Sequence, residues 1–178
     1  MTGKVVGIGL VGLGTMTVTV GSALVANAFV KSTNLPPDLG PLLPQILLWF
    51  VLGFTLYAFA FAAAGAMVAR QEEVQSVTLP LASFQIVGFL LVYATIASPD
   101  SNLIRVLSFL PPWAPVLMPA RTFLGTAQAW EVALAVGLEL LSIWGMVVLT
   151  ARIYQDALVR GGARLTWSEA LRIGRGGR

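Results

Sequence analysis

Four long stretches of this sequence carry almost no charge, and each is long enough to cross a lipid bilayer as a helix. A helix needs about 20 predominantly apolar residues to span the hydrocarbon core. The stretches cover, approximately, residues 5–30, 42–69, 77–97 and 130–151. Because they fill more than half of the chain, the sequence predicts an all-α fold: a polytopic membrane helix bundle with four transmembrane helices in a single transmembrane domain, residues 1–178.

The composition excludes several classes of protein. The chain has 57% hydrophobic and only 11% charged residues, against about 25% charged in an ordinary soluble domain. It has no cysteine and no histidine, so it forms no disulfide, has no thiol nucleophile and is poorly equipped to bind zinc. The net charge of +3 is small, and nucleic-acid binding usually needs a concentrated basic patch. We expect no metal site and no nucleic-acid partner.

The basic residues predict the orientation in the membrane. With both termini in the cytoplasm, the inner side carries eight of them: Lys4, Arg70, Arg152, Arg160, Arg164, Arg172, Arg175 and Arg178. The outer side then carries three: Lys31, Arg105 and Arg121. The positive-inside rule favours this arrangement, which predicts outer loops at residues 31–41 and 98–129 and a cytoplasmic tail at residues 154–178.

The first stretch contains a glycine stripe, formed by Gly7, Gly14 and Gly21 on one helical face. Such a face lets another helix approach closely in lipid. Residues 7–12 also match GxGxxG, but they lie in an apolar run without a preceding strand, so helix packing explains them better. A cleaved signal peptide is an alternative for this stretch, although its apolar run is longer than usual. A second small-residue run, residues 60–66, indicates either tight helix contact or neutral filler.

An unusual segment lies between the third and fourth stretches, over residues 100–121. It is strongly apolar and rich in proline. Non-helical backbone at membrane depth survives only against protein or a water-filled cavity, so the segment predicts a proline-rich re-entrant hairpin on the outer side. The candidate gate residues are Pro111, Pro112, Pro115, Met118, Pro119 and Arg121. The alternative is an interfacial segment anchored by Trp113.

Two polar side chains lie inside the predicted spans, Glu139 in the fourth and Asn27 in the first. A carboxyl group near mid-membrane is costly and normally faces the bundle interior or a cavity. Glu139 therefore indicates either a role in substrate or ion passage, or a neutral acid that helps assembly. Asn27 raises the same question more weakly.

The inner loop between the second and third stretches, residues 70–76, is short and charged. It is either a solvated turn or a contact surface for a cytoplasmic subunit. The residues expected to make that contact are Arg70, Glu72, Glu73 and Gln75. Pro80 follows, where we expect it near a helix start because its missing N–H costs least there.

Taken in order, four segments resemble the C-terminal half of ABC-2-type ABC transporter permeases, particularly the NatB-like branch. Residues 3–12 resemble the start of the family's third membrane helix, and residues 72–76 with Leu79-Pro80 resemble its Glu-Glu-Ala-Gln loop. Residues 109–121 resemble its proline hairpin, with the element Pro-x-x-Met-Pro-x-Arg, and residues 151–154 resemble the close of its last helix. The family's first two helices and its coupling helix have no counterpart here, so we expect a fragment or one piece of a split permease.

The resemblance implies a membrane-spanning permease subunit of an ATP-driven exporter in the bacterial cytoplasmic membrane. The chain itself would be no enzyme and would bind no cofactor, because it lacks GxxxxGK[ST]. ATP and magnesium would be bound by a separate nucleotide-binding ATPase subunit. Other implied partners are a second permease copy or the missing N-terminal half, and lipid; the substrate would be sodium or an amphiphilic drug. Two alternatives remain, a non-transporting membrane scaffold and an ion carrier that uses Glu139.

Overall fold

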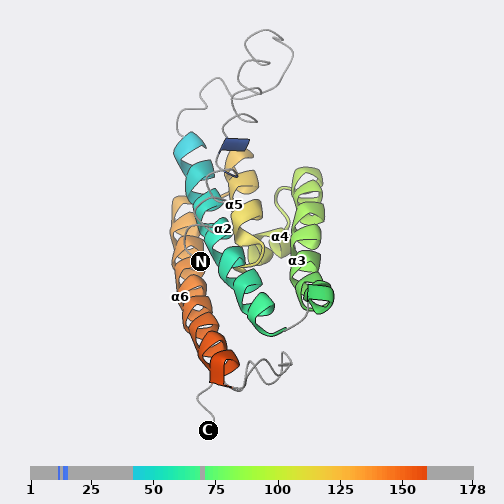
Figure 1. Ribbon diagram of the computed structural model, residues 1–178. Helices are drawn as coiled ribbons and strands as arrows, with labels where there is room; N and C mark the ends of the chain where they lie inside the picture. Colours follow the sequence, from blue (N-terminus) through green and yellow to red (C-terminus); the bar gives the residue numbers. More distant parts are fainter. Residues whose placement is uncertain (1–11, 13, 16–41, 69–70, 160–178) are drawn as a thin grey trace. The chain divides into compact units, whose positions relative to one another are not determined.

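The computed structural model describes residues 12, 14–15, 42–68 and 71–159. The chain divides into two units, Met1–Pro44 and Gln45–Arg178, and the second holds nearly all the described residues. Every regular element in this described part is a helix (Figure 1). The helices are α2 (Leu42–Ala66), α3 (Gln71–Ala97), α4 (Asn102–Leu107), α5 (Ala114–Phe123) and α6 (Ala129–Val159).

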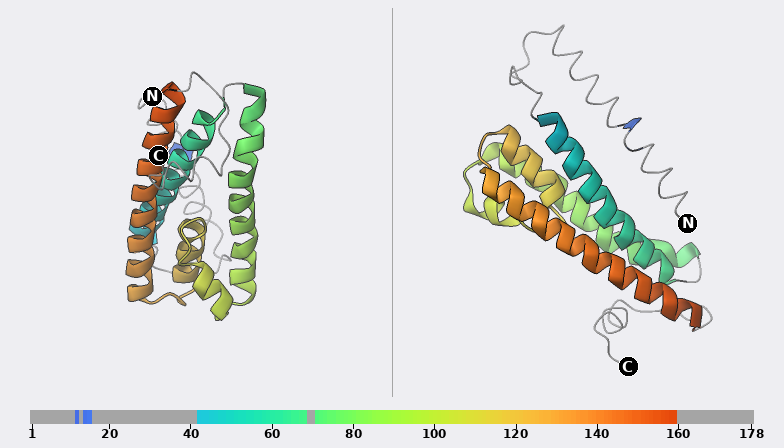
Figure 2. Two further views of the ribbon diagram at one scale, coloured as in Figure 1. Left: turned by 90° about the horizontal axis from the view of Figure 1, so that it is seen from below. Right: turned by 90° about the vertical axis from the view of Figure 1, so that its left-hand side faces the viewer.

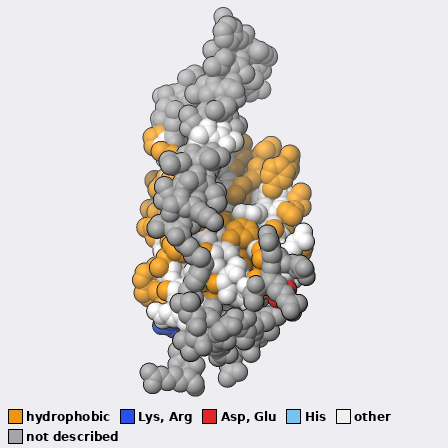
Figure 3. Space-filling view, in the orientation of Figure 1, with side chains coloured by type: hydrophobic (Ala, Val, Ile, Leu, Met, Phe, Trp, Pro, Cys, Tyr) orange, Lys and Arg blue, Asp and Glu red, His pale blue; other side chains and the backbone are white. Residues whose placement is uncertain are grey.

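Three of these helices are long and apolar enough to cross a membrane. The candidate spans are Pro44–Ala66 in α2, Glu73–Ala97 in α3 and Ala129–Ile153 in α6. They coincide with three of the four predicted stretches, whereas the stretch at residues 5–30 lies almost entirely outside the described residues. Large apolar side chains such as Ile86 and Trp144 are exposed along them, and hydrophobic atoms cover much of the described surface in Figure 3. An apolar exterior of this kind suits a helix that faces lipid.

Helix α3 extends further toward its N-terminus than its apolar stretch does. It begins at Gln71, which corrects the prediction of a loop over residues 70–76, because glutamine and glutamate are good helix formers and can continue a helix beyond the hydrophobic core. Pro80 consequently lies inside α3 rather than near its start. A proline there leaves the carbonyl four residues earlier without its usual helical donor. Helix α6 likewise continues to Val159, past the predicted end of its span.

Two clusters of buried side chains hold the long helices together. The first joins α2, α5 and α6 through Trp49, Leu52, Ala114, Met118 and Ala135. These residues come from three helices that are far apart in the sequence. They form a hydrophobic core in which the segment between α3 and α6 packs against α2 and α6 through Ala114 and Met118.

The second cluster joins α2 to α6 alone, through Ala63, Met67 and Ile153. Ala63 and Ala64 are both fully buried, and the Thr150 hydroxyl of α6 donates a hydrogen bond to the Phe59 carbonyl of α2 at 3.2 Å. Small side chains permit this close approach of two helices. The tight-contact interpretation of the small-residue run is thereby confirmed at Ala63.

Candidate functional site

The segment between α3 and α6 folds back on itself as a helical hairpin. Helix α4 leads into a turn at residues 108–113, and α5 returns from it. Figures 1 and 2 show α4 and α5 between α3 on one side and the pair α2 and α6 on the other. We refer to residues 98–128 as the hairpin and to residues 108–113 as its tip.

Two hydrogen bonds to α2 measure how far the tip reaches along the bundle. Near the start of α2, the Gln45 amide donates to the Thr122 hydroxyl at 3.0 Å. Further along, the Tyr57 hydroxyl donates to the Pro112 carbonyl at 2.8 Å. Tyr57 lies twelve residues after Gln45, which corresponds to about 18 Å of helix at 1.5 Å per residue. Helix α5 therefore runs antiparallel to α2, and the tip lies well inside the length of the bundle.

Trp113 fastens the tip to α3. Its indole N–H donates to the Phe84 carbonyl at 2.9 Å, and the Trp113 and Phe84 rings lie 6.1 Å apart. The indole also reaches Gly88, where a Cβ would lie only 3.1 Å from Trp113 Cδ1. The glycine thus provides the space into which the tryptophan fits.

A second glycine accommodates the start of α5. A Cβ at Gly53 of α2 would lie 2.7 Å from Pro115 Cβ, a separation shorter than any ordinary carbon contact. Pro115 itself occupies the first turn of α5, where its missing N–H removes no helical hydrogen bond. The hairpin is therefore seated between two glycines, Gly53 on α2 and Gly88 on α3, neither of which the sequence analysis singled out.

The other candidate gate residues lie on the same hairpin. Pro111 and Pro112 belong to the tip, Pro119 lies inside α5, and Met118 is fully buried. Helix α5 ends at Phe123, and Gly125, two residues further on, has a φ of +72°. The N–H groups of Gly125 and Thr126 return to the carbonyls of residues 122 and 121, which is the Schellman arrangement that terminates a helix.

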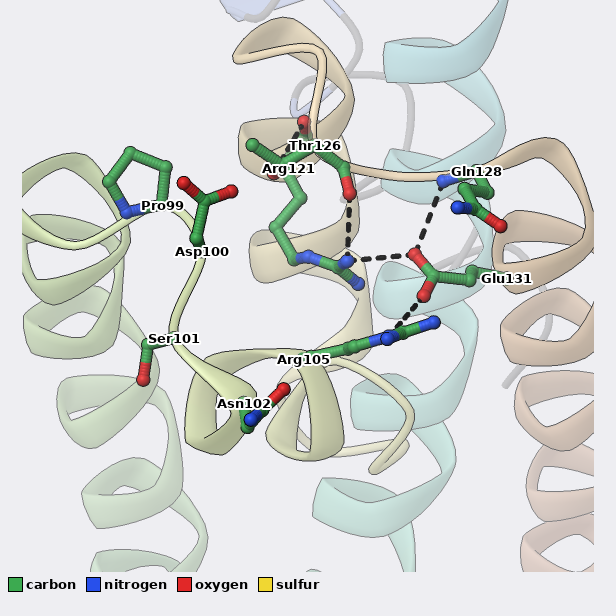
Figure 4. A pocket seen from close by; sticks show the side chains of 9 residues that line it. All are labelled: Pro99, Asp100, Ser101, Asn102, Arg105, Arg121, Thr126, Gln128 and Glu131. Atoms are coloured by element: carbon green, nitrogen blue, oxygen red, sulfur yellow. Dashed lines mark hydrogen bonds and ion pairs between the residues drawn. The ribbon is translucent and has the colours of Figure 1, made fainter.

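Ion pairs join the hairpin to the start of α6 (Figure 4). The Arg121 guanidinium donates to the Glu131 carboxylate at 2.7 Å. It also donates to the Ser108 hydroxyl at 2.9 Å. Arg105 of α4 binds the other oxygen of the same carboxylate. Glu131, in the first turn of α6, thus connects α4, α5 and α6. We call Arg105, Arg121 and Glu131 the latch.

The latch consists of an almost fully buried pair and a more exposed third member. The side chains of Arg121 and Glu131 are 3% and 1% exposed, whereas that of Arg105 is 45% exposed. Charges that are removed from water need partners, and these partners are supplied within the hairpin and α6. Separating the buried pair would be costly, whereas the contribution of Arg105 is expected to be small.

A polar cavity of about 120 Å³ opens beside the latch. Its wall comes from residues 99–101 of the α3–α4 loop, from Asn102 at the start of α4, and from residues that follow along the hairpin and α6 (Figure 4). Those residues are Arg105, Arg121, Thr126, Gln128 and Glu131. The cavity mixes two acidic with two basic side chains, counting Asp100, so it carries no net charge.

Glu139 lies on α6, eight residues after Glu131, and it is fully buried. Within the described part of the chain, neither of its carboxyl oxygens has a hydrogen-bond partner. The carboxyl group interacts electrostatically with Tyr57, the same residue that binds the tip carbonyl of Pro112. Glu139 is therefore a buried acid close to the hairpin tip.

The remaining predicted site residues lie away from the hairpin or outside the described residues. Glu72, Glu73 and Gln75 are in the first turns of α3, at the end opposite the α3–α4 loop. Arg70, Gly7, Gly21 and Asn27 are outside the described residues, while Gly14 is described as helical. Their roles in partner contact and helix packing stay predictions. Within the described residues, no group of three His, Cys, Asp or Glu side chains is placed to hold a metal ion.

The positions of three charged residues in the sequence give one signal for the latch. Arg105, Arg121 and Glu131 border strongly apolar segments, and charges in such places must find partners. The identity of the pairs could not be derived, because the three residues lie on three different helices. Gly53 and Gly88 gave no distinguishing signal among the chain's 18 glycines.

Comparison with known proteins places these features in a family context. A family profile described as "ABC-2 family transporter protein" matches residues 1–152. YhaP of Bacillus subtilis (strain 168), an uncharacterized protein, is 28% identical over 169 residues, which cover 89% of this chain and 40% of YhaP. The uncharacterized protein MJ1024 of Methanocaldococcus jannaschii is 21% identical over 127 residues, covering 71% of this chain and 32% of MJ1024. The chain thus spans less than half of these relatives, and no solved structure matches it.

Proposed function

The chain belongs to the ABC-2 family of transporter proteins, and we propose that its hairpin is the movable outer gate of an ATP-driven export permease. A permease component of an ABC transporter is the role that the family implies. The single observation that carries the gate proposal is the reach of the tip, about 18 Å along α2 from Gln45 to Tyr57. A segment that enters so far between the long helices obstructs any path along them.

The way the hairpin is held supports a movable element. Hydrogen bonds, glycine contacts and the latch fasten it to α2, α3 and α6 at separate points. Such discrete contacts can break and re-form together, as a two-state element requires. A gate that seals one state and clears the other needs this property.

Helix α3 supplies a mechanical route from the cytoplasmic side to the tip. Its first turns carry Glu73 and Gln75, and its middle carries Phe84, which accepts the Trp113 hydrogen bond. About 16 Å of helix separates Glu73 from Phe84, at 1.5 Å per residue. We propose that an ATPase subunit binds Arg70, Glu72, Glu73 and Gln75, and that ATP binding and hydrolysis displace α3 and release the tip.

The proposed membrane arrangement completes the path. We propose that residues 5–30 supply a fourth span, that both termini are cytoplasmic, and that the hairpin re-enters the bacterial cytoplasmic membrane from the outside. The exported substrate is sodium or an amphiphilic compound. A second permease copy or an N-terminal half provides the rest of the pathway, since the relatives are much longer than this chain.

A reversible crosslink tests the gate. Gln45 and Thr122 are replaced by cysteine together in the complete permease with its ATPase subunit, because their side chains are in contact across α2 and α5 and the chain has no cysteine of its own. A short bifunctional methanethiosulfonate reagent joins the two thiols, because cysteine is shorter than the glutamine it replaces. The crosslink should abolish transport in membrane vesicles, and reduction should restore it, while each single cysteine variant transports at all times. Transport that continues at the normal rate with the crosslink in place would exclude a moving hairpin. Purification without an ATPase subunit would favour the membrane scaffold.

A further inference from the structure

Among the described residues, the carboxyl group of Glu139 has no hydrogen-bond partner, although it lies next to the moving part of the proposed gate. Its side chain has no solvent exposure. A carboxylate taken out of water without a cation or donor is strongly disfavoured, and such a group neutralises instead. A proton is small enough to occupy a site that is closed to solvent, and its binding neutralises the carboxylate.

Among the described residues, no cation is placed to neutralise Glu139. On α2 the facing ionisable group is Tyr57, which interacts with it electrostatically. The tip and the start of α5, residues 108–118, contain no ionisable side chain. On α6 the nearest acid, Glu131, already holds Arg105 and Arg121. Helix α3 offers only Tyr93 between residues 74 and 97.

The surroundings of Glu139 change when the tip leaves. Displacement of the tip breaks the hydrogen bond from Tyr57 to Pro112, so the Tyr57 hydroxyl becomes free to donate elsewhere. It also admits water to the space that the tip had filled. Both changes stabilise the ionised carboxylate relative to the neutral acid.

We propose that Glu139 is a proton-binding site that is occupied while the hairpin is seated and empties when the tip is displaced. The hairpin position and the proton are then thermodynamically linked, because each state binds the proton with a different affinity. The seated state holds one more proton, so a rise in pH favours the displaced state. For one linked proton, the ratio of displaced to seated hairpins rises by up to about tenfold per pH unit. The inference rests on the proposed gate function, since it needs a hairpin that moves.

Spin-label distances in the complete permease with its ATPase subunit, in lipid nanodiscs, test the linkage. Labels at Leu110 on the tip and Leu141 on α6 are suitable because both side chains are exposed in the seated state. At mildly alkaline pH we expect a second, longer distance that is scarce at mildly acidic pH. The Glu139→Gln variant, which resembles the neutral acid, should keep the seated distance at both pH values. The control Asp100→Asn, an exposed acid near the other end of the hairpin, should retain the pH response.

Infrared spectroscopy provides a second readout, independent of the labels. In the seated state the C=O stretch of a protonated carboxylic acid should be present and should disappear in Glu139→Gln. Absence of that band from the natural protein, or an equal pH response in Glu139→Gln, would overturn the proton site. A hairpin that moves with nucleotide but not with pH would also overturn it while leaving the gate intact. A hairpin that holds one distance in every nucleotide state and at every pH would instead overturn the gate.

Discussion

Arg121 and Glu131 form an ion pair across 2.7 Å with both side chains almost fully buried. The pair joins the return helix of the hairpin, α5, to the start of α6. With the pair between Arg105 and Glu131, it is one of two ion pairs that join the hairpin to α6 in the described part of the chain. One point of the hairpin's attachment consequently depends on two residues that are ten positions apart and lie on different helices.

Replacing Arg121 by methionine should destabilise the protein strongly. Glu131 would lose its buried partner, and breaking a buried pair on one side costs about 3–5 kcal/mol. Thermal unfolding in detergent and proteolysis of the hairpin measure the effect. The double variant Arg121→Met/Glu131→Met should recover much of the loss, because apolar residues of similar size often replace a buried ion pair without penalty. Arg105→Met, at a partly exposed position, should cost only about 0–1 kcal/mol.

Substitution of Gly53 by alanine should loosen the hairpin. The added Cβ would lie 2.7 Å from Pro115 Cβ, so α2 and α5 must move apart, and overpacking of this kind costs about 1–3 kcal/mol. The matched control is Gly137→Ala on α6, where no atom lies within 4 Å of the new Cβ. That variant should gain about 0.5–1 kcal/mol, because alanine favours the helix interior over glycine. Equal melting temperatures for the two variants would argue against the tight contact at Gly53.

Trp113→Phe should weaken the attachment of the tip to α3 while keeping an aromatic ring in place. It removes the indole donor to the Phe84 carbonyl, and a hydrogen bond of this type contributes about 0.5–1.5 kcal/mol. A cysteine at Ala114, which is fully buried directly after the tip, should become more accessible to water-soluble thiol reagents. Trp144→Phe serves as the control, since Trp144 is 67% exposed on α6. A tip equally protected in both variants would refute the anchoring role of Trp113.

Gly125→Ala isolates the cost of ending α5. A Cβ at this position meets nothing within 4 Å, but the residue has a φ of +72°. Alanine in this left-handed conformation costs about 1–2 kcal/mol, so the variant should melt earlier than the natural protein for backbone reasons alone. The melting temperature of Gly125→Asn should lie between those of the natural protein and Gly125→Ala, because asparagine tolerates the left-handed conformation better than alanine does. If alanine and asparagine proved equally harmless, the helix end would have to adopt another geometry.

The hairpin could be predicted from the sequence only in part. Its prolines and apolar side chains predicted a re-entrant hairpin. The structure has a turn at Pro111 and Pro112, and the entry of this segment into the membrane stays a prediction. The segment predicted as an inner loop, residues 70–76, is in contrast helical from Gln71, where α3 begins. Hydropathy detects where a helix is apolar, and it does not detect where a polar extension of the same helix starts.

The sequence by itself determined that this chain contains membrane-spanning helices, because the length and apolarity of each stretch are local properties. It also determined the family, whose pattern runs through residues 1–152. Only the tertiary structure decided that Arg121 meets Glu131, that Pro115 fits against Gly53, and that Glu139 lies near the hairpin tip. Such contacts depend on how helices far apart in the chain pack, and many pairings of the same residue types satisfy the sequence pattern equally well.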